Sequence, residues 1–179
     1  MKKSPFPEQG AYPFLLMDEE HFAGQCRFDA YTASGHGGQK RNRTYSAIRA
    51  THLPTGISVI AEESRSQHEN KKRALRRLRK AIALRTRKET PLQELDARII
   101  SFVCSDTAPR MNPKNPLYPI MCATLLDMLY HAHGKISDAA HRLGISSGRM
   151  NKLLAADKDL FTAANNVRTL FNLKPLIFR

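Results

Sequence analysis

The run Ser34-Gly35-His36-Gly37-Gly38-Gln39 decides how this 179-residue sequence is interpreted, and a basic, polar segment ending at Arg49 follows it. Two glycines before a glutamine allow positive φ angles and close packing where a Cβ would clash. The run therefore predicts a loop that presents one neutral amide at its tip, with positive charge beside it. Such a loop is suited to placing a water molecule beside an ester within an RNA cavity.

The net charge is the second guide to function. The chain has 29 Lys and Arg residues against 16 Asp and Glu, a formal net charge of +13. Residues 36–90 hold 15 basic against 4 acidic side chains, residues 105–179 hold 10 against 5, and residues 1–35 hold 3 against 5. An excess of this size, concentrated around and after the glycine loop, indicates a polyanionic partner, most often nucleic acid. A basic surface that only confers solubility is the alternative.

Cysteine and histidine positions argue against a metal centre. Cys26, Cys104 and Cys122 are far apart and lack the spacing of zinc sites, so we expect a reducing compartment, no disulfide and no cofactor. His131 and His133 lie on different faces of a predicted helix and are interpreted as surface or packing residues. The sequence has neither an apolar stretch long enough for a membrane nor an apolar signal core, so we expect a cytoplasmic protein without a membrane partner.

Local patterns predict an α+β fold, with a small antiparallel sheet and one long basic helix, followed by a helical part. Residues 1–14 are rich in Pro and Gly and are expected to be loosely ordered. A short helix with Asp18 as its N-cap is predicted between Leu15 and Gly24. Strands are predicted at 26–33, 44–52 and 57–61, with the turn Leu53-Pro54-Thr55-Gly56 between the last two.

The clearest predicted helix runs from Ser64 to Lys88. Ser66 and Glu69 have the spacing of a capping box. An apolar stripe is predicted from Ala74, Leu75, Leu78, Ala81 and Ile82, and Lys and Arg crowd the remaining surface. Because opposite charges are nearly absent from this run, i,i+4 pairing does not explain it, and contact with an RNA backbone is favoured over a solvated face.

The second half of the chain is predicted to be helical. A short element of undecided type is expected around Leu95–Val103, residues 106–115 are interpreted as a linker, and helices are predicted at 120–133, 137–143, 146–155 and 157–171. The expected organisation is an N-terminal segment 1–24, an α+β domain 25–90 with the glycine loop, a linker 91–116 and a helical domain 117–179.

The flanks of the glycine loop add a longer pattern. They are Lys40-Arg41-Asn42-Arg43-Thr44, Ser46-Ala47-Ile48-Arg49, His52-Leu53-Pro54-Thr55-Gly56-Ile57, Arg65-Ser66-Gln67 and Asn70. With these flanks, residues 25–88 resemble the catalytic domain of class I peptide chain release factors. The resemblance implies a small α+β domain whose Gly-Gly-Gln loop enters the ribosomal peptidyl transferase centre and hydrolyses the peptidyl-tRNA ester.

The resemblance implies catalytic roles for Gly37, Gly38 and Gln39. The Gln39 backbone N–H would stabilise the developing oxyanion or the leaving hydroxyl, and its side chain would orient water. The loop holds no Asp, Glu or Cys to serve as base or nucleophile, so positioning and electrostatic stabilisation must supply the catalysis. His36 is interpreted as shaping the loop. The residues predicted to support the loop are Ser34, Gly35, Asn42, Thr44 and Ser46.

The residues predicted to bind RNA are Lys40, Arg41, Arg43, Arg49, Arg65, Gln67, Asn70, Lys71, Lys72, Arg73, Arg76, Arg77, Lys80, Arg149 and Lys152. For Arg65, Gln67 and Asn70, helix capping or bracing of the loop is an equal alternative. Arg41 and Tyr45 depart from the family pattern, in which Val and an acidic residue are usual.

About 24 residues precede the domain, too few for a stop-codon decoding domain, and Ser4-Pro5-Phe6 is interpreted as a chance match to a stop-recognition tripeptide. The chain thus resembles short, codon-independent release-factor-like proteins that rescue stalled ribosomes. The implied partners are large-subunit rRNA and peptidyl-tRNA, with mRNA or a delivery protein for the C-terminal part. We expect a monomer.

The segment from Ile136 to Ser146, followed by Met150, Leu153 and Leu154, predicts a helix-turn-helix. Its second helix would offer Arg149 and Lys152 to RNA, whereas a module that binds protein or only packs is the alternative. Two functions follow: peptidyl-tRNA hydrolysis on whole ribosomes or split large subunits, or nucleic-acid-binding regulation through the helix-turn-helix with a non-catalytic loop.

Overall fold

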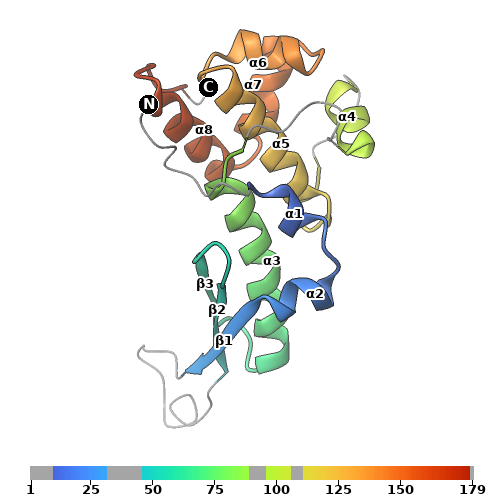
Figure 1. The fold of residues 1–179 in the computed structure, drawn as a ribbon, viewed down its shortest axis with the longest axis vertical. Helices are drawn as coiled ribbons and strands as arrows, with labels where there is room; N and C mark the ends of the chain where they lie inside the picture. The colour runs from blue at the N-terminus through green and yellow to red at the C-terminus, as the bar shows by residue number, and fades with distance from the viewer. Residues whose placement is uncertain (1–9, 32–45, 89–95, 106–110, 178–179) are drawn as a thin grey trace. The chain divides into compact units, whose positions relative to one another are not determined.

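The computed structural model describes residues 10–31, 46–88, 96–105 and 111–177. Within these ranges the chain forms two compact units. One unit spans Leu16–Ile82, and the other comprises the described residues of Met1–Leu15 and Ala83–Arg179. Figure 1 follows the elements along the chain. None of the helices in the described residues is long and apolar enough to cross a membrane.

The first unit is built on a three-stranded antiparallel sheet in the order β1-β2-β3, with strands β1 (Cys26–Tyr31), β2 (Ala47–His52) and β3 (Ser58–Ala61). Tyr31 pairs with Ala47 at one end of the β1–β2 ladder, and Cys26 pairs with His52 at the other. The predicted turn between β2 and β3 is confirmed, with Gly56 at φ +67, where a side chain would be strained. The predicted α+β class is confirmed.

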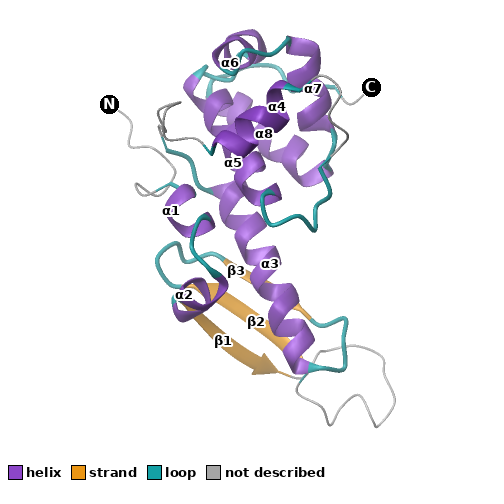
Figure 2. Cartoon of the chain, turned by 90° about the vertical axis from the view of Figure 1, so that its right-hand side faces the viewer, coloured by secondary structure: helices purple, strands orange, loops and turns teal. Residues whose placement is uncertain are grey.

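Helices α2 (Glu19–Gly24) and α3 (Gln67–Arg85) complete this unit, although the last turn of α3 belongs to the helical unit. Figure 2 shows α3 lying across one face of the sheet. The predicted apolar stripe is confirmed, because Ala74, Leu78 and Ile82 are fully buried. The predicted N-cap of α2 is confirmed as well, because Asp18 Oδ1 accepts a hydrogen bond from the His21 backbone N–H at 2.8 Å.

The predicted capping box at the start of α3 forms only in part. Ser66 Oγ accepts the Glu69 backbone N–H at 3.3 Å, as expected. The Glu69 carboxylate accepts the Ser64 hydroxyl at 2.6 Å, however, and the Ser66 backbone N–H donates to Ser64 Oγ at 3.1 Å. Ser64 therefore takes the place of the reciprocal bond, because the turn before the helix folds back onto its first residues.

The second unit is a helical assembly around α5. Its helices are α1 (Tyr12–Leu15), α4 (Ala97–Cys104), α5 (Tyr118–His131), α6 (Ile136–Arg142), α7 (Ser147–Ala155) and α8 (Lys158–Leu170). Every residue of α5 from Tyr118 to Leu129 is buried, because α1, α4, α6 and α8 all pack against it. The four helices predicted for this part are confirmed, with ends shifted by one or two residues, and the undecided element is helix α4.

The expectation of a loosely ordered N-terminus is wrong for its described residues. Tyr12, Phe14 and Leu15 are buried in α1, which packs against α5. The Tyr12 hydroxyl hydrogen-bonds Thr124 Oγ1 within the core. Gly10 turns the chain into this helix at φ +66. Gly10 does turn the chain, but glycine and proline content could not show that Tyr12 and Phe14 have a partner helix far along the chain.

Candidate functional site

The predicted catalytic loop falls outside the described residues. This applies to Ser34, Gly35, Gly37, Gly38, Gln39, Lys40, Arg41, Asn42, Arg43 and Thr44. The structure describes the two chain segments that flank them. The chain leaves the sheet at Tyr31, the last residue of β1, and returns at Ser46, next to Ala47 of β2. Because Tyr31 pairs directly with Ala47, both ends of the segment that holds the Gly-Gly-Gln run lie at one end of the sheet.

Asn70 connects this end of the sheet to the first turn of α3. Its side chain is fully buried. Nδ2 donates to the Ser46 carbonyl at 2.7 Å and to the Ser64 carbonyl at 2.8 Å, and Oδ1 accepts the Ser64 backbone N–H at 3.0 Å. Of the two roles expected for Asn70, these contacts serve bracing, because burial takes the amide away from any RNA surface. Arg65 and Gln67 lie nearby in sequence and are exposed.

The basic side chains of α3 have different contacts on different sides of the helix. On one side, Glu63 lies 2.5 Å from the Arg77 guanidinium and 4.0 Å from that of Arg73, and Glu69 lies 3.6 Å from Arg73 in an i,i+4 pair. Arg77 also donates to the Ile60 carbonyl of β3 at 2.7 Å. One i,i+4 pair thus forms within the run, and Arg73 and Arg77 also have a partner, Glu63, that the prediction did not consider because it lies in the turn before the helix.

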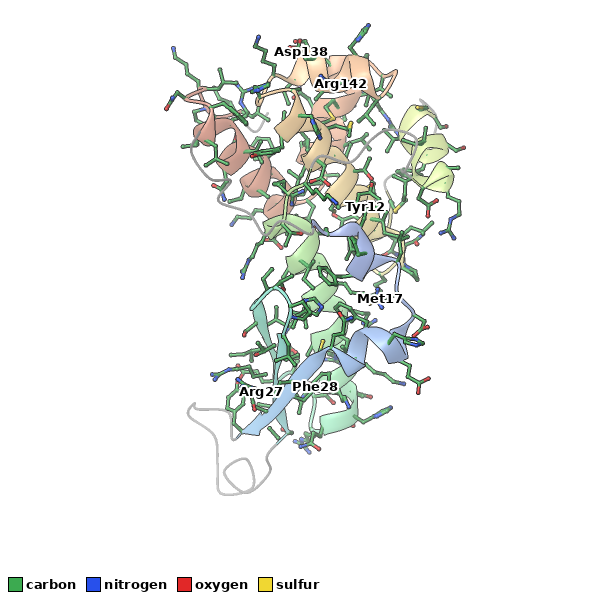
Figure 3. All side chains as sticks on the ribbon, viewed as in Figure 1. Tyr12, Met17, Arg27, Phe28, Asp138 and Arg142 are labelled. Atoms are coloured by element: carbon green, nitrogen blue, oxygen red, sulfur yellow. The ribbon has the colours of Figure 1, made fainter. Side chains whose placement is uncertain are left out.

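A cleft of about 270 Å³ lies on another side of α3. It is lined by Lys72, Leu75, Arg76 and Arg79 of α3 and by Glu19, the first residue of α2. Lys72 and Arg76 are exposed, so the cleft offers cations to a ligand from solvent. Lys71 is exposed as well, and its Nζ lies 4.4 Å from the centre of the Phe28 ring; Figure 3 labels Phe28 on β1. Lys80 is only half-buried.

Arg79 has a structural role that the sequence pattern did not reveal. Its Nη2 donates to the Met17 carbonyl at 2.8 Å and to the Asp18 carbonyl at 2.9 Å. Its guanidinium lies 4.2 Å from the centre of the Phe22 ring, in the geometry of a cation–π contact. Arg79 thereby fastens α2 to α3 and forms a wall of the cleft. The one sequence signal that could have suggested this contact is the aromatic Phe22 in the short predicted helix before the sheet.

The Phe22 ring also stacks on His52, with ring centres 5.3 Å apart. His52 is fully buried, and its ring nitrogens hydrogen-bond Thr55 Oγ1 at 2.9 Å and Gln25 Oε1 at 3.2 Å. Burial lowers the pKa of His52 to about 4, so the ring is neutral near pH 7. This cluster stands at the end of β2 away from the Gly-Gly-Gln segment, and it supports the sheet.

Arg49 is exposed on β2, and its guanidinium lies 5.6 Å from the centre of the Tyr31 ring. Tyr31 and Arg49 therefore place an aromatic ring and a cation together beside the end of the sheet from which the loop leaves. Such a pair is suited to stacking on a nucleobase or holding a phosphate.

The predicted helix-turn-helix is present as α6 and α7. Gly144 lies in the turn at φ +67, and Ser146 Oγ accepts the Arg149 backbone N–H at 3.1 Å, as predicted for the cap of the second helix. Ala140, Met150 and Leu154 are buried between the helices of this unit. Lys152 is exposed on α7, and Figure 3 labels Asp138 and Arg142 on α6.

Helix α4 meets both parts of this motif. Cys104 Sγ donates to the Leu143 carbonyl at 3.2 Å, and Arg149 Nε donates to the Val103 carbonyl at 3.5 Å. Arg149 is thus half-buried and turned toward the end of α4. The sequence predicted it to face RNA; the contact with α4 depends on a segment 46 residues away and has no local signal.

The described residues of the first unit thus present exposed cations at Arg49 on β2 and at Lys72 and Arg76, which line the cleft beside α2. No group of three or more His, Cys, Asp or Glu side chains that could hold a metal ion occurs in the part of the chain that the structure describes.

Residues 22–108 match the family model described as the RF-1 domain. This segment belongs to the RF-1 domain family. The match confirms the resemblance to class I release factors, and it extends beyond the predicted 25–88 to include α4.

Individual relatives agree with the family match. The chain is 34% identical over 133 residues to peptide chain release factor 1 of Carboxydothermus hydrogenoformans, covering 74% of this chain and 32% of the relative. It is 33% identical over 143 residues to peptide chain release factor 1 of Acetivibrio thermocellus, covering 80% and 35%. For the same factor of Paraburkholderia phytofirmans the identity is 35% over 138 residues, covering 77% and 34%. The matched region therefore spans about a third of the length of these curated relatives.

Proposed function

We propose that this protein hydrolyses peptidyl-tRNA on the ribosome and that it does so without reading a stop codon. The observation that carries the proposal is the Gly37-Gly38-Gln39 run in the segment that joins β1 to β2 of an RF-1 domain. The same domain has exposed cations at Arg49 and on α3. These cations support contact with rRNA, since phosphate neutralisation supplies a large share of the affinity of proteins for nucleic acids.

In this proposal the loop positions water and stabilises charge. The Gln39 backbone N–H stabilises the oxyanion or the leaving hydroxyl of the tRNA, and the Gln39 side chain orients water at the ester. Gly37 and Gly38 allow the backbone to reach that point. The segment from Ser34 to Thr44 contains no carboxylate or thiol, so proton transfer falls to RNA groups and water rather than to a protein base.

The test is release of labelled peptide from ribosomes stalled on truncated mRNA. Wild type should release the peptide, and Gln39→Ala, which keeps the backbone N–H but removes the side chain that orients water, should lower the rate by about 100-fold. Ribosomes with a stop codon or a sense codon in the decoding site should give equal rates, because the activity is codon-independent. Absence of release by wild type would refute the proposal, and release only at stop codons would refute its codon-independent part.

Whole ribosomes and isolated large subunits carrying peptidyl-tRNA should be compared in the same assay, because either is a candidate substrate. The helical unit is the candidate for choosing between them, through contact with mRNA, rRNA or a delivery protein. A fragment ending at residue 104 is expected to bind ribosomes more weakly than the full chain. Equal rescue by the two would show that the helical unit does not target the protein.

A second function is favoured by the formed helix-turn-helix, with Gly144 in its turn and Ser146 as its cap. In that case the chain is a nucleic-acid-binding regulator whose loop is not catalytic. Binding to duplex DNA or structured RNA that depends on Lys152 and Arg142, together with no peptide release, would support this alternative over hydrolysis.

A further inference from the structure

The segment with the Gly-Gly-Gln run joins two antiparallel strands whose ends are paired at Tyr31 and Ala47. Strand pairing alone fixes the chain up to these two residues. Ser46 precedes β2 and lies outside the ladder. A contact that holds Ser46 therefore fixes the point at which the chain returns from that segment.

We propose that Asn70 is a positioning residue for peptidyl-tRNA hydrolysis, and that it acts by holding the Ser46 carbonyl. The inference rests on the proposed function. Nδ2 of Asn70 donates to the Ser46 carbonyl at 2.7 Å, a shorter distance than either of its bonds to Ser64. Asn70 stands in the first turn of α3, a helix of 19 residues that packs on the sheet. We call this Asn70–Ser46 hydrogen bond the clamp. It ties the residue at which the chain returns from the loop to a long, rigid helix.

The chemistry of the clamp requires an amide. Nδ2 supplies two donors, for the carbonyls of Ser46 and Ser64, and Oδ1 accepts the Ser64 N–H. A carboxylate of the same shape has no donor when ionised, so Asp at this position would set negative charge against two carbonyl oxygens. The side chain is fully buried, and water cannot replace these bonds without opening the site. Asn70→Asp therefore removes the clamp while keeping side-chain volume.

His52 offers a matched control. Like Asn70 it is fully buried and hydrogen-bonded, and it lies on the same strand, β2, as the chain that returns from the loop. It stands at the opposite end, where it pairs with Cys26. His52→Ala should loosen the domain without touching Ser46. Thr55→Val, which removes one hydrogen bond to His52, is a milder control should His52→Ala fold poorly.

The experiment measures single-turnover peptide release from stalled ribosomes against protein concentration, with full-length wild type, Asn70→Asp, Asn70→Ala and the control. We expect both Asn70 variants to lower the maximal rate by about 10- to 100-fold, because a displacement near 1 Å at a reacting group costs about that much. The concentration for half-maximal rate should change by less than about threefold, since the exposed cations remain. The control should leave the maximal rate within about threefold of wild type at a temperature where all variants are folded.

Hydrogen exchange of the peptide covering residues 46–52 supplies a readout that is independent of ribosomes. Amides next to Ser46 should exchange faster in the Asn70 variants and at the wild-type rate in Thr55→Val. Wild-type release with equal maximal rates in the Asn70 and control variants would overturn the inference and leave the proposed function intact. Failure of wild type to release peptide would instead overturn the proposed function, and with it a role for Asn70 in hydrolysis.

Discussion

The buried ion pair between Arg87 and Asp127 gives a prediction whose size follows from the structure. Arg87 Nη1 donates to Asp127 Oδ1 at 2.7 Å, and both side chains are 0% exposed. Arg87 also donates to the carbonyls of Ala83 and Ala123, so the guanidinium is fixed within the helical unit. Asp127→Asn keeps the shape of the side chain and removes its charge. The guanidinium would then stay buried but lose the charge of the carboxylate that faces it.

Removing one partner of a buried ion pair destabilises a protein by about 3–5 kcal/mol, which is a large part of a typical stability of about 5–15 kcal/mol. We expect Asp127→Asn to lower the free energy of unfolding of the helical unit by that amount. Replacing both partners, as Arg87→Met with Asp127→Leu, should restore stability to within about 1 kcal/mol of wild type or exceed it, because desolvation of both charges is then avoided.

The measurement is urea denaturation, followed by helical circular dichroism and by hydrogen exchange of α5 peptides, which reports on this unit alone. Asp138→Asn is the control, because Asp138 lies 3.9 Å from Lys135 in an exposed pair of the same unit. It should change stability by less than about 0.5 kcal/mol. If Asp127→Asn lowers the free energy of unfolding no more than Asp138→Asn does, the reasoning that the buried guanidinium depends on the Asp127 carboxylate is wrong.

Three further predictions concern the RF-1 domain and the helix-turn-helix. Burial lowers the pKa of His52 from 6.5 to about 4, so its contribution to the free energy of unfolding is complete above pH 6.5. That contribution should fall by about 1.4 kcal/mol per pH unit between pH 6.5 and pH 4. His52→Gln should remove this pH dependence from denaturation curves. Gly144→Ala should lower the stability of the helical unit by about 1 kcal/mol, because φ is +67 there; an unchanged melting temperature would contradict this. Lys72→Gln with Arg76→Gln should weaken ribosome binding. The slope of log affinity against log salt concentration should become shallower by about one unit for each phosphate that is no longer neutralised. Arg77→Gln removes a charge that is paired with Glu63 and should change this slope less.

Local signals in the sequence were sufficient for most of the elements, although α1 was not predicted and the type of α4 was left undecided. The three strands, the turn at Gly56 and α3 were predictable because residue periodicity and turn residues act over a few positions. The contacts that organise the site were not predictable in this way. Asn70 reaches Ser46 across 24 residues, and Arg79 reaches Met17 across 62. The local sequence around an asparagine or an arginine does not show whether its side chain binds RNA or a backbone carbonyl of its own domain.

The basic run of α3 shows what this difference means for function. In the sequence it is a nearly uniform series of cations from Lys71 to Lys80. In the structure, Glu63 and Glu69 neutralise the side that faces β3, where Arg77 also binds the Ile60 carbonyl. The side that faces α2 keeps exposed Lys72 and Arg76 beside a cleft with Glu19 as its acidic residue.

The positive charge of α3 is therefore concentrated on the side that faces α2 and partly neutralised on the side that faces β3. An RNA backbone would gain more from the α2 side, because cations already paired with carboxylates release fewer counterions when a phosphate approaches. The Asn70 clamp lies in the first turn of this same helix. A single helix thus carries both the exposed cations beside the cleft and the contact that holds Ser46.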